Sequence, residues 1–334
     1  MNHNLFKRIV RKCGRIRDYV RNNFLYFCMD YSSDEKIRYS CRKILLRWLL
    51  RGRKLVGFYG ECHIYVYAEL LRKSREFKRK YVAVGDKEIE YLIRYHKQIN
   101  KPSVWNKLDV LIFNSGVPIR QGGPGLSEVL EWLPKEALRI GVTNATFLGY
   151  MPQHTSRVFP NQGYFIWGDK NLNRILEAEE NIDENLRILG GEEYYSVAQV
   201  QEHFSKAIKK LSTYEKNCII KIADYIEENG RNRILYYSVT HPETEIMIEL
   251  ARRIAEKLDV HDIGNTDSFE TELFNLHSHG EVVYPSVCKG LGISDALASN
   301  RKIQPGNYPV EYTFEEYIRE YVNRAGMKEE RNHD

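Results

Sequence analysis

Short apolar runs alternate with amphipathic stretches through most of the chain. Five runs have the length and composition of buried strands, at 55–59, 81–84, 109–113, 139–143 and 233–238. Helical periodicity follows them at 64–77, 87–98, 126–133, 196–228 (with a break near Ser212-Thr213) and 243–258, and a last helix is expected near 314–322. Strands that alternate with helices are typical of a parallel sheet covered on both faces. The pattern therefore predicts a three-layer α/β fold with a parallel sheet of about five strands.

Two segments depart from this rhythm. Residues 145–195 are rich in Pro, Gly and aromatic residues, and we interpret them as an insertion that shapes a substrate region. Residues 1–53 form a basic helical leader, in which apolar positions alternate with arginines and lysines at 5–27 and 37–50. We expect one α/β catalytic domain over 54–330, closed by a C-terminal cap.

The charge of the chain is divided between leader and body. Residues 1–54 contain fifteen Lys and Arg against four Asp and Glu, a net charge of +11, so the other 280 residues carry −6 of the total of +5. Basic amphipathic helices bind anionic membrane surfaces or acidic partners. The leader is expected to dock in this way or, alternatively, to pack on the domain with its charges solvated. The acidic body lacks a nucleic-acid reader motif, which argues against a nucleic-acid partner.

The composition also indicates in which cellular compartment the protein works. The six cysteines form no C-x-x-C pair and no disulfide-framework spacing, which suits a reducing cytosol. No run approaches the roughly 18 to 20 apolar residues that span a bilayer, and arginines interrupt every early apolar run before a signal peptide could form. We expect a cytoplasmic protein, with the leader offering peripheral attachment at the inner membrane face.

The turn Gly60-Glu61-Cys62-His63 joins the first predicted strand to the first predicted helix. It places Cys62 where the first helical N–H groups have no intrahelical partner and the helix dipole is positive. That environment favours the thiolate, which is the reactive form of cysteine. Cys62 is therefore the candidate nucleophile. The other interpretation is a cysteine that packs as a small core residue.

Polar residues follow three other predicted strands: Asn114, Asn144 and His241. Ligands of parallel α/β sheets bind beyond the carboxyl ends of the strands, so these residues are expected near Cys62. A proline follows His241, as at a helix start, and His241 is the candidate base. Asn114 and Asn144, with the backbone around Gly60, are candidate oxyanion or substrate contacts. Each polar side chain could instead cap a strand or a helix.

His63 lies one helical step round from Cys62 and is expected to be an accessory or substrate contact. A metal site is the rival use of such residues. Cys62-His63 and His277-Ser278-His279 could supply nitrogen and sulfur ligands, but neither has the spacing of a structural zinc site. We expect no metal.

Taken in order, several short motifs resemble the WcbI family of capsular-polysaccharide biosynthesis proteins. They are the turn at 60–63, Gly-Tyr-Met-Pro at 149–152, Glu215 in the long helix, Thr-His-Pro at 240–242 and Tyr-Pro-Ser at 284–286. The resemblance covers roughly residues 54–325 and leaves the leader outside. The family's turn usually reads Gly-Asn-Cys-Gln, and here Glu61 and His63 replace the flanking amides.

The resemblance implies an SGNH-hydrolase-like fold, akin to the flavodoxin-like arrangement, with a cysteine in the nucleophile's place. It also implies an O-acetyltransferase that moves an acetyl group from acetyl-coenzyme A to a sugar hydroxyl of a capsular or surface polysaccharide precursor. Its partners would be acetyl-coenzyme A and a polysaccharide or sugar-nucleotide acceptor. Cys62 would attack the thioester and His241 would act as base. Direct transfer, with His241 as base and no acyl-enzyme, is the other route.

Two further functions stay open: an esterase or deacetylase with the same Cys-His pair, and a non-catalytic coenzyme A- or glycan-binding subunit docked by the leader. Coenzyme A carries several phosphate charges and the body is net acidic, so binding needs local cations or helix N-termini. Arg120, in the glycine-rich loop after the third strand, and Arg157, in the insertion, are the candidates.

Overall fold

The structure is a computed structural model that describes residues 50–60, 62–83, 105–115, 125–158, 165–263, 280–294, 302–305 and 310–326. Most of the leader, the predicted helix at 87–98, Arg120 and the His277-Ser278-His279 segment lie outside these residues. The backbone of Cys62 is described, but its side chain is not.

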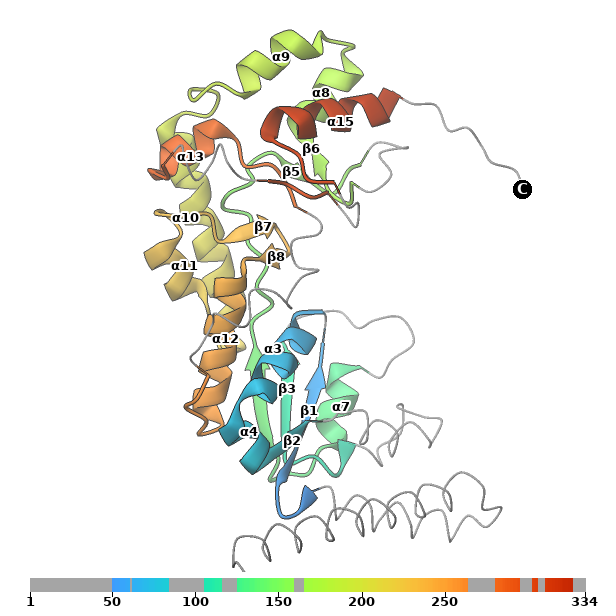
Figure 1. Ribbon diagram of the computed structural model, residues 1–334, viewed down its shortest axis with the longest axis vertical. Coiled ribbons are helices and arrows are strands. Elements are labelled where there is room, and N and C mark those ends of the chain that lie inside the picture. Colours follow the sequence, from blue (N-terminus) through green and yellow to red (C-terminus); the bar gives the residue numbers. More distant parts are fainter. Residues whose placement is uncertain are drawn as a thin grey trace, which may run out of the picture. The chain divides into compact units, whose positions relative to one another are not determined.

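A four-stranded parallel sheet forms the frame of the α/β fold, with the strand order β2-β1-β3-β4 (Figure 1). Its strands are β1 (Lys54–Tyr59), β2 (Tyr81–Ala83), β3 (Val110–Asn114) and β4 (Leu138–Val142). Lys54 is in register with Tyr81, and Val56 with Ala83. These four strands confirm the predicted runs at 55–59, 81–84, 109–113 and 139–143 to within one residue at each end.

The prediction of a fifth strand in this sheet is wrong for the run at 233–238. That run forms β7 (Tyr236–Ser238), which pairs antiparallel with β8 (His241–Pro242) in a separate two-stranded sheet. Ile220 lies beside β4 instead and makes a single parallel bridge to Val142. An apolar run shows that a strand is buried, but not which strand it pairs with, and this limit explains the error.

The chain divides into two compact units. The first comprises residues 1–58, 75–111 and 119–139, and its described helices are α4 (Arg75–Lys80) and α7 (Leu126–Trp132). Asp109 helps to order this unit, because its carboxylate accepts a hydrogen bond from the N–H of Leu55 at 2.6 Å. Its backbone N–H also donates to the carbonyl of Leu55, at 2.9 Å. The predicted helix at 126–133 is confirmed by α7.

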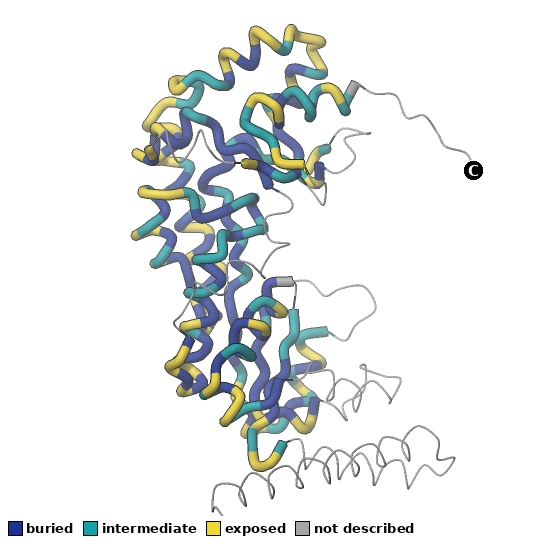
Figure 2. Tube along the Cα trace, viewed as in Figure 1, coloured by how far each residue is buried: buried dark blue, intermediate teal, exposed yellow. Residues whose placement is uncertain are grey.

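The second unit comprises residues 59–74, 112–118 and 140–334. Within it α3 packs along α12, α10 along α13, and α15 against α8 and α9 (Figure 1). Its helices are α3 (Cys62–Lys73), α8 (Lys170–Glu177), α9 (Ile182–Leu189), α10 (Val197–Tyr214), α11 (Ala223–Asn229), α12 (Thr244–Lys257), α13 (Pro285–Leu291) and α15 (Phe314–Gly326), with a 3-10 turn, η1, at Glu215–Asn217. The buried residues of α12 follow one of its faces, whereas β3 is buried along nearly its whole length (Figure 2).

The long predicted helix at 196–228 is interrupted as expected, but after Tyr214 rather than at Ser212. The cause is Glu215, whose buried carboxylate accepts hydrogen bonds from the N–H groups of Ile222 at 2.7 Å and Ala223 at 3.2 Å. These are orphan donors at the start of α11, so the carboxylate caps that helix. The interruption is therefore built around one buried acid.

The segment at 145–195, which we interpreted as an insertion, contains the two-stranded sheet of β5 (His154–Thr155) and β6 (Gly168–Asp169), followed by α8 and α9. Asp169 caps α8 by accepting hydrogen bonds from the N–H groups of Asn171 and Leu172. The same buried carboxylate accepts a hydrogen bond from the hydroxyl of Tyr284 at 2.8 Å. Burial raises the pKa of Asp169 to about 6.

The sequence pattern did not predict α13, which begins with Pro285 at its first position and is followed by Gly292 as a left-handed C-cap. None of the helices in the described part of the chain has the length and apolar character needed to cross a membrane.

Candidate active site

The turn between β1 and α3 requires glycine at position 60. Gly60 has a φ of +151°, a backbone conformation that side chains disfavour. A Cβ there would lie 2.3 Å from the side-chain oxygen of Asn114, at the end of β3. Gly60 thus lets the buried amide of Asn114 lie against the turn, and Cys62 follows as the first residue of α3.

His63 is buried at 2% exposure, and its Nε2 lies 2.8 Å from the carbonyl oxygen of Thr240. A carbonyl can only accept, so Nε2 carries the hydrogen and donates it. Burial lowers the pKa of His63 from 6.5 to about 4, and the ring is therefore neutral at pH 7. Its Nδ1 has no hydrogen-bond partner among the described residues. The ring is closed off from solvent, which suits the accessory role expected for this residue better than a direct substrate contact; both stay predictions.

His241 lies directly beside this contact. Its ring centroid is 6.4 Å from that of His63, with the two rings nearly perpendicular at 88°. Its Nδ1 is 3.1 Å from the hydroxyls of both Ser238 and Thr240. Consecutive Cα atoms are about 3.8 Å apart. The contact between the two histidines therefore brings the backbone of Cys62 to the neighbourhood of His241.

The helix after His241 begins later than predicted. His241 and Pro242 form β8, and α12 starts at Thr244 with Glu243 as its N-cap. Pro242 is therefore not the first residue of the helix. The N–H of Glu243 donates to the carbonyl of Leu235 at 2.9 Å, which extends the pairing of the two segments one residue past Pro242.

A residue that the sequence pattern did not single out anchors the loop of His241. One carboxylate oxygen of Glu281 accepts a hydrogen bond from the N–H of Val239 at 3.0 Å, and the other lies 2.8 Å from Nδ1 of His154. The N–H of Glu281 donates to the carbonyl of Tyr237 at 2.8 Å. A charged residue directly before two buried valines, Val282 and Val283, was the available signal.

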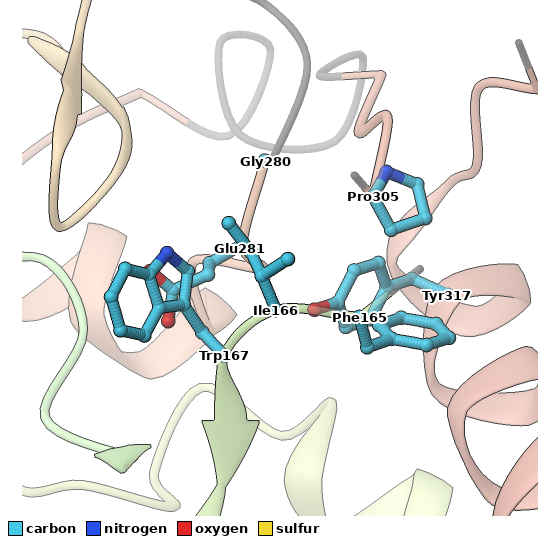
Figure 3. A pocket seen from close by; sticks show the side chains of 7 residues that line it. All are labelled: Phe165, Ile166, Trp167, Gly280, Glu281, Pro305 and Tyr317. Carbon is cyan, nitrogen blue, oxygen red and sulfur yellow. The ribbon is translucent and has the colours of Figure 1, made fainter. Parts of the chain in front are cut away.

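The other side of Glu281 borders a small pocket (Figure 3). Phe165, Trp167, Gly280 and Tyr317 line it with the glutamate, and the ring of Phe165 lies 5.1 Å from that of Tyr317. It holds no space for even a water-sized molecule. Among the described residues, the aromatic side chains of this pocket therefore pack closely around one side of Glu281.

Asn144 lies in a different and larger pocket, of about 440 Å³. This pocket adjoins the ends of β3 and β4, where Ser115 and Thr143 also line it. The role of Asn144 as an oxyanion or substrate contact stays a prediction.

Of the two candidate coenzyme A arginines, the structure describes Arg157 alone. Arg157 follows β5, and its guanidinium forms a 2.6 Å ion pair with Glu177 in which the arginine side chain is 67% exposed. Arg120 lies outside the described residues.

In the described part of the chain there is no cluster of three or more His, Cys, Asp or Glu that could hold a metal ion.

Comparison with known proteins extends this account. The family model for the polysaccharide biosynthesis enzyme WcbI matches residues 55–262. A solved structure of WcbI, 21% identical, superposes with a TM-score of 0.62 over 82% of this chain and 90% of the other. That structure is described as a novel polysaccharide biosynthesis enzyme, in its native form without a disulfide bond between coenzyme A and one of its cysteines. No curated protein matches the sequence.

The matched segment contains the β1–α3 turn, β3, β4 and the β7–β8 turn, and hence Gly60, Cys62, Asn114, Asn144 and His241. The segment matched by the family model covers more than half of the sequence. The chain belongs to the WcbI family of polysaccharide biosynthesis enzymes.

Proposed function

We propose that this protein is an O-acyltransferase that moves an acetyl group from acetyl-coenzyme A to a sugar hydroxyl of a capsular or surface polysaccharide precursor. Cys62 is the nucleophile and His241 is the base. The observation that carries the proposal is the pair of contacts from His63 to Thr240 and His241, which draws the start of α3 to the β7–β8 turn.

In the first half-reaction, His241 takes the proton of the Cys62 thiol while the sulfur attacks the thioester carbonyl. The carbon–sulfur bond to coenzyme A breaks, and the departing thiolate receives a proton from His241. In the second, His241 takes the proton of a sugar hydroxyl as its oxygen attacks the acetyl-cysteine. The Cys62 thiolate leaves, and His241 returns the proton to it.

Two features at the turn suit this chemistry. The first backbone N–H groups of α3 have no intrahelical partner, and they favour both the thiolate of Cys62 and the oxyanion that forms on the carbonyl. The amide of Asn114 lies against Gly60 and is the side-chain candidate for the same oxyanion. His63 acts as a positioning residue, because it is buried and neutral and holds the carbonyl directly before His241.

The coenzyme A part of the proposal is supported by the related WcbI structure, whose description names coenzyme A beside a cysteine. Arg120 and Arg157 remain the proposed phosphate contacts of this chain, and an SGNH-hydrolase-like fold remains a proposal. Arg157 would have to exchange Glu177 for a phosphate oxygen, a small cost for an exposed ion pair.

Incubation with acetyl-coenzyme A followed by peptide mass spectrometry tests the proposal. We expect one acetyl group on the peptide that contains Cys62, and none in Cys62→Ala. His241→Ala should slow acetylation by a factor of about 10² to 10⁴. His261→Ala, at an exposed histidine paired with Asp259, is the matched control and should acetylate normally.

Thermal unfolding separates binding from chemistry. Coenzyme A at a hundred times its dissociation constant should stabilise the protein by about 2.7 kcal/mol, in the wild type and in Cys62→Ala alike. If coenzyme A does not raise the unfolding temperature, the proposed transferase function is wrong. If acetate is released steadily and added sugars do not reduce that release, the protein is an esterase.

A further inference from the structure

The pocket of about 440 Å³ beside Asn144 has no role in the chemistry described above. Its walls are the segments after β3 and β4 on one side and α10 on the other. Its volume falls in the range of small-molecule sites, which is roughly 300 to 1,000 Å³.

The lining of this pocket is rich in short neutral hydrogen-bonding groups. Hydroxyls come from Ser115 and Thr146, and amides from Asn144 and Asn217. Tyr214 stands at the edge of the pocket with 65% of its surface exposed, so its ring is open to a ligand. Hydroxyls and amides each both donate and accept, as a polyhydroxylated ligand requires, and an open aromatic ring packs against its apolar faces.

The charge of the pocket argues against the phosphates of coenzyme A. Lys210 is the single cationic side chain among its described lining residues, and its Nζ lies 5.9 Å from the ring centroid of Tyr214. Sites for phosphate groups gather several cations or forked arginines. One lysine beside a tyrosine suits a neutral ligand or one with a single negative charge.

The pocket is joined to the candidate active site by the backbone. Ser115 directly follows Asn114, whose side chain lies against Gly60. On the other side, the N–H of Phe147 donates to the carbonyl of Val239 at 2.8 Å. Thr146 therefore borders the turn that carries His241. The walls of the pocket are therefore continuous with the two segments that carry the groups proposed to transfer the acetyl group.

We propose that this pocket binds the saccharide unit of the acceptor. Asn144 and Asn217 hydrogen-bond the sugar hydroxyls, the ring of Tyr214 packs against a sugar face, and Lys210 pairs with an acidic substituent where one is present. The inference rests on the proposed acyl transfer, because it assigns the acceptor side of that reaction.

A cysteine placed in the pocket wall provides a direct test. Ala207→Cys puts a thiol on the α10 side of the pocket, and Ser205→Cys puts one at an exposed position of the same helix outside the pocket lining. Both are small changes. Labelling by a methanethiosulfonate reagent is followed at each position by peptide mass spectrometry. The probes are methyl glycosides of hexoses, N-acetylhexosamines, deoxyhexoses, heptoses and uronic acids, and separately coenzyme A.

At twice its dissociation constant a ligand fills two thirds of the sites, so at least one glycoside should slow labelling at position 207 about threefold. Labelling at 205 should not change. The double change Asn144→Ala with Asn217→Ala should abolish the protection. Protection by coenzyme A with none from any glycoside would overturn the proposal and assign the pocket to the donor. Protection by neither would overturn it as well.

The same samples distinguish this failure from failure of the acyl transfer. Cys62 acetylation and the thermal shift with coenzyme A do not depend on the acceptor pocket. If both succeed while every glycoside fails to protect position 207, the transferase proposal stands and the pocket assignment falls. If acetylation and the shift fail too, the acyl-transfer proposal is itself wrong.

Discussion

His63 and Thr240 are joined by a 2.8 Å hydrogen bond that spans 177 positions of the chain. The donor is a neutral imidazole next to the candidate nucleophile, and the acceptor is the carbonyl next to the candidate base. Burial keeps the imidazole neutral, because a charged ring at this position would lack solvation. One buried side chain thus fixes the position of the His241 loop relative to the start of α3.

This neutral histidine should make the protein sensitive to acid. The pKa of His63 is about 4 in the folded state, against 6.5 for a solvated histidine. Between these values the unfolded chain binds a proton that the native state does not, so stability falls as the pH drops from 6.5 to 4. The full loss is about 3 kcal/mol. His63→Gln keeps a donor for Thr240 but does not titrate. Its free energy of unfolding, measured in urea, should therefore fall by about 3 kcal/mol less than that of the wild type between pH 6.5 and 4. An unchanged pH slope would contradict this account.

Asp169 should act in the opposite direction over nearly the same window. Its pKa is about 6 when folded against 3.8 for a solvated aspartate, so the native state binds the extra proton. Its contribution is fully present below pH 3.8 and is lost as the pH rises through 6, by about 3 kcal/mol. Asp169→Asn keeps an acceptor for the N-terminus of α8 but does not titrate. The variant should lose stability in acid more steeply than the wild type, measured in the same urea series. Asp183→Asn, at an exposed carboxylate, is the control and should follow the wild-type curve.

Gly60→Ala should destabilise more than Gly292→Ala. Both glycines have positive φ, but a Cβ at Gly292 meets nothing within 4 Å, whereas one at Gly60 meets the oxygen of Asn114 at 2.3 Å. The variant at 292 bears backbone strain, and the variant at 60 bears a clash worth about 1 to 3 kcal/mol in addition. Denaturant unfolding measures the difference. In a double-mutant cycle, Asn114→Ala should relieve part of the cost at 60, and strict additivity would refute the clash.

Glu281→Ala should be costly, although the residue is absent from the proposed chemistry. It removes the acceptor of the buried Val239 N–H and the partner of His154. Each buried group left unsatisfied costs about 1 to 3 kcal/mol. The exposed Glu177, paired with Arg157, provides the matched change, and its loss should cost less than about 1 kcal/mol. Equal unfolding midpoints for the two variants would show that Glu281 is not an anchor.

Much of the sheet could be predicted from the sequence because its strands are short apolar runs bounded by turns. Leu55 and Val56 in β1, and Leu111 and Ile112 in β3, are buried at 2% or less. Their pattern indicates burial on both faces, which is typical of a covered parallel sheet. The family resemblance was confirmed as well.

The parts that could not be predicted depend on partners far away in the sequence. The run at 233–238 is as apolar as the others, yet β7 pairs with β8 because the chain turns back at Val239 and Thr240. Glu281 acquires its role only when the fold brings Val239 and His154 to it. The burial of His63 depends likewise on the β7–β8 turn, and local sequence carries no signal for it.

The bridge at Ile220 has a consequence for association between chains. β4 is the outer strand of the parallel sheet, and an uncovered outer strand offers its N–H and carbonyl groups to any other extended chain. Here the carbonyl of Gly141 accepts from the N–H groups of Ile219 and Ile220, and Thr143 donates to the carbonyl of Ile220. A short stretch of irregular chain thus occupies the hydrogen-bonding groups of this outer strand, so that a strand of another chain cannot pair with it there. Loss of this stretch would leave a folded sheet with a point from which aggregates can start.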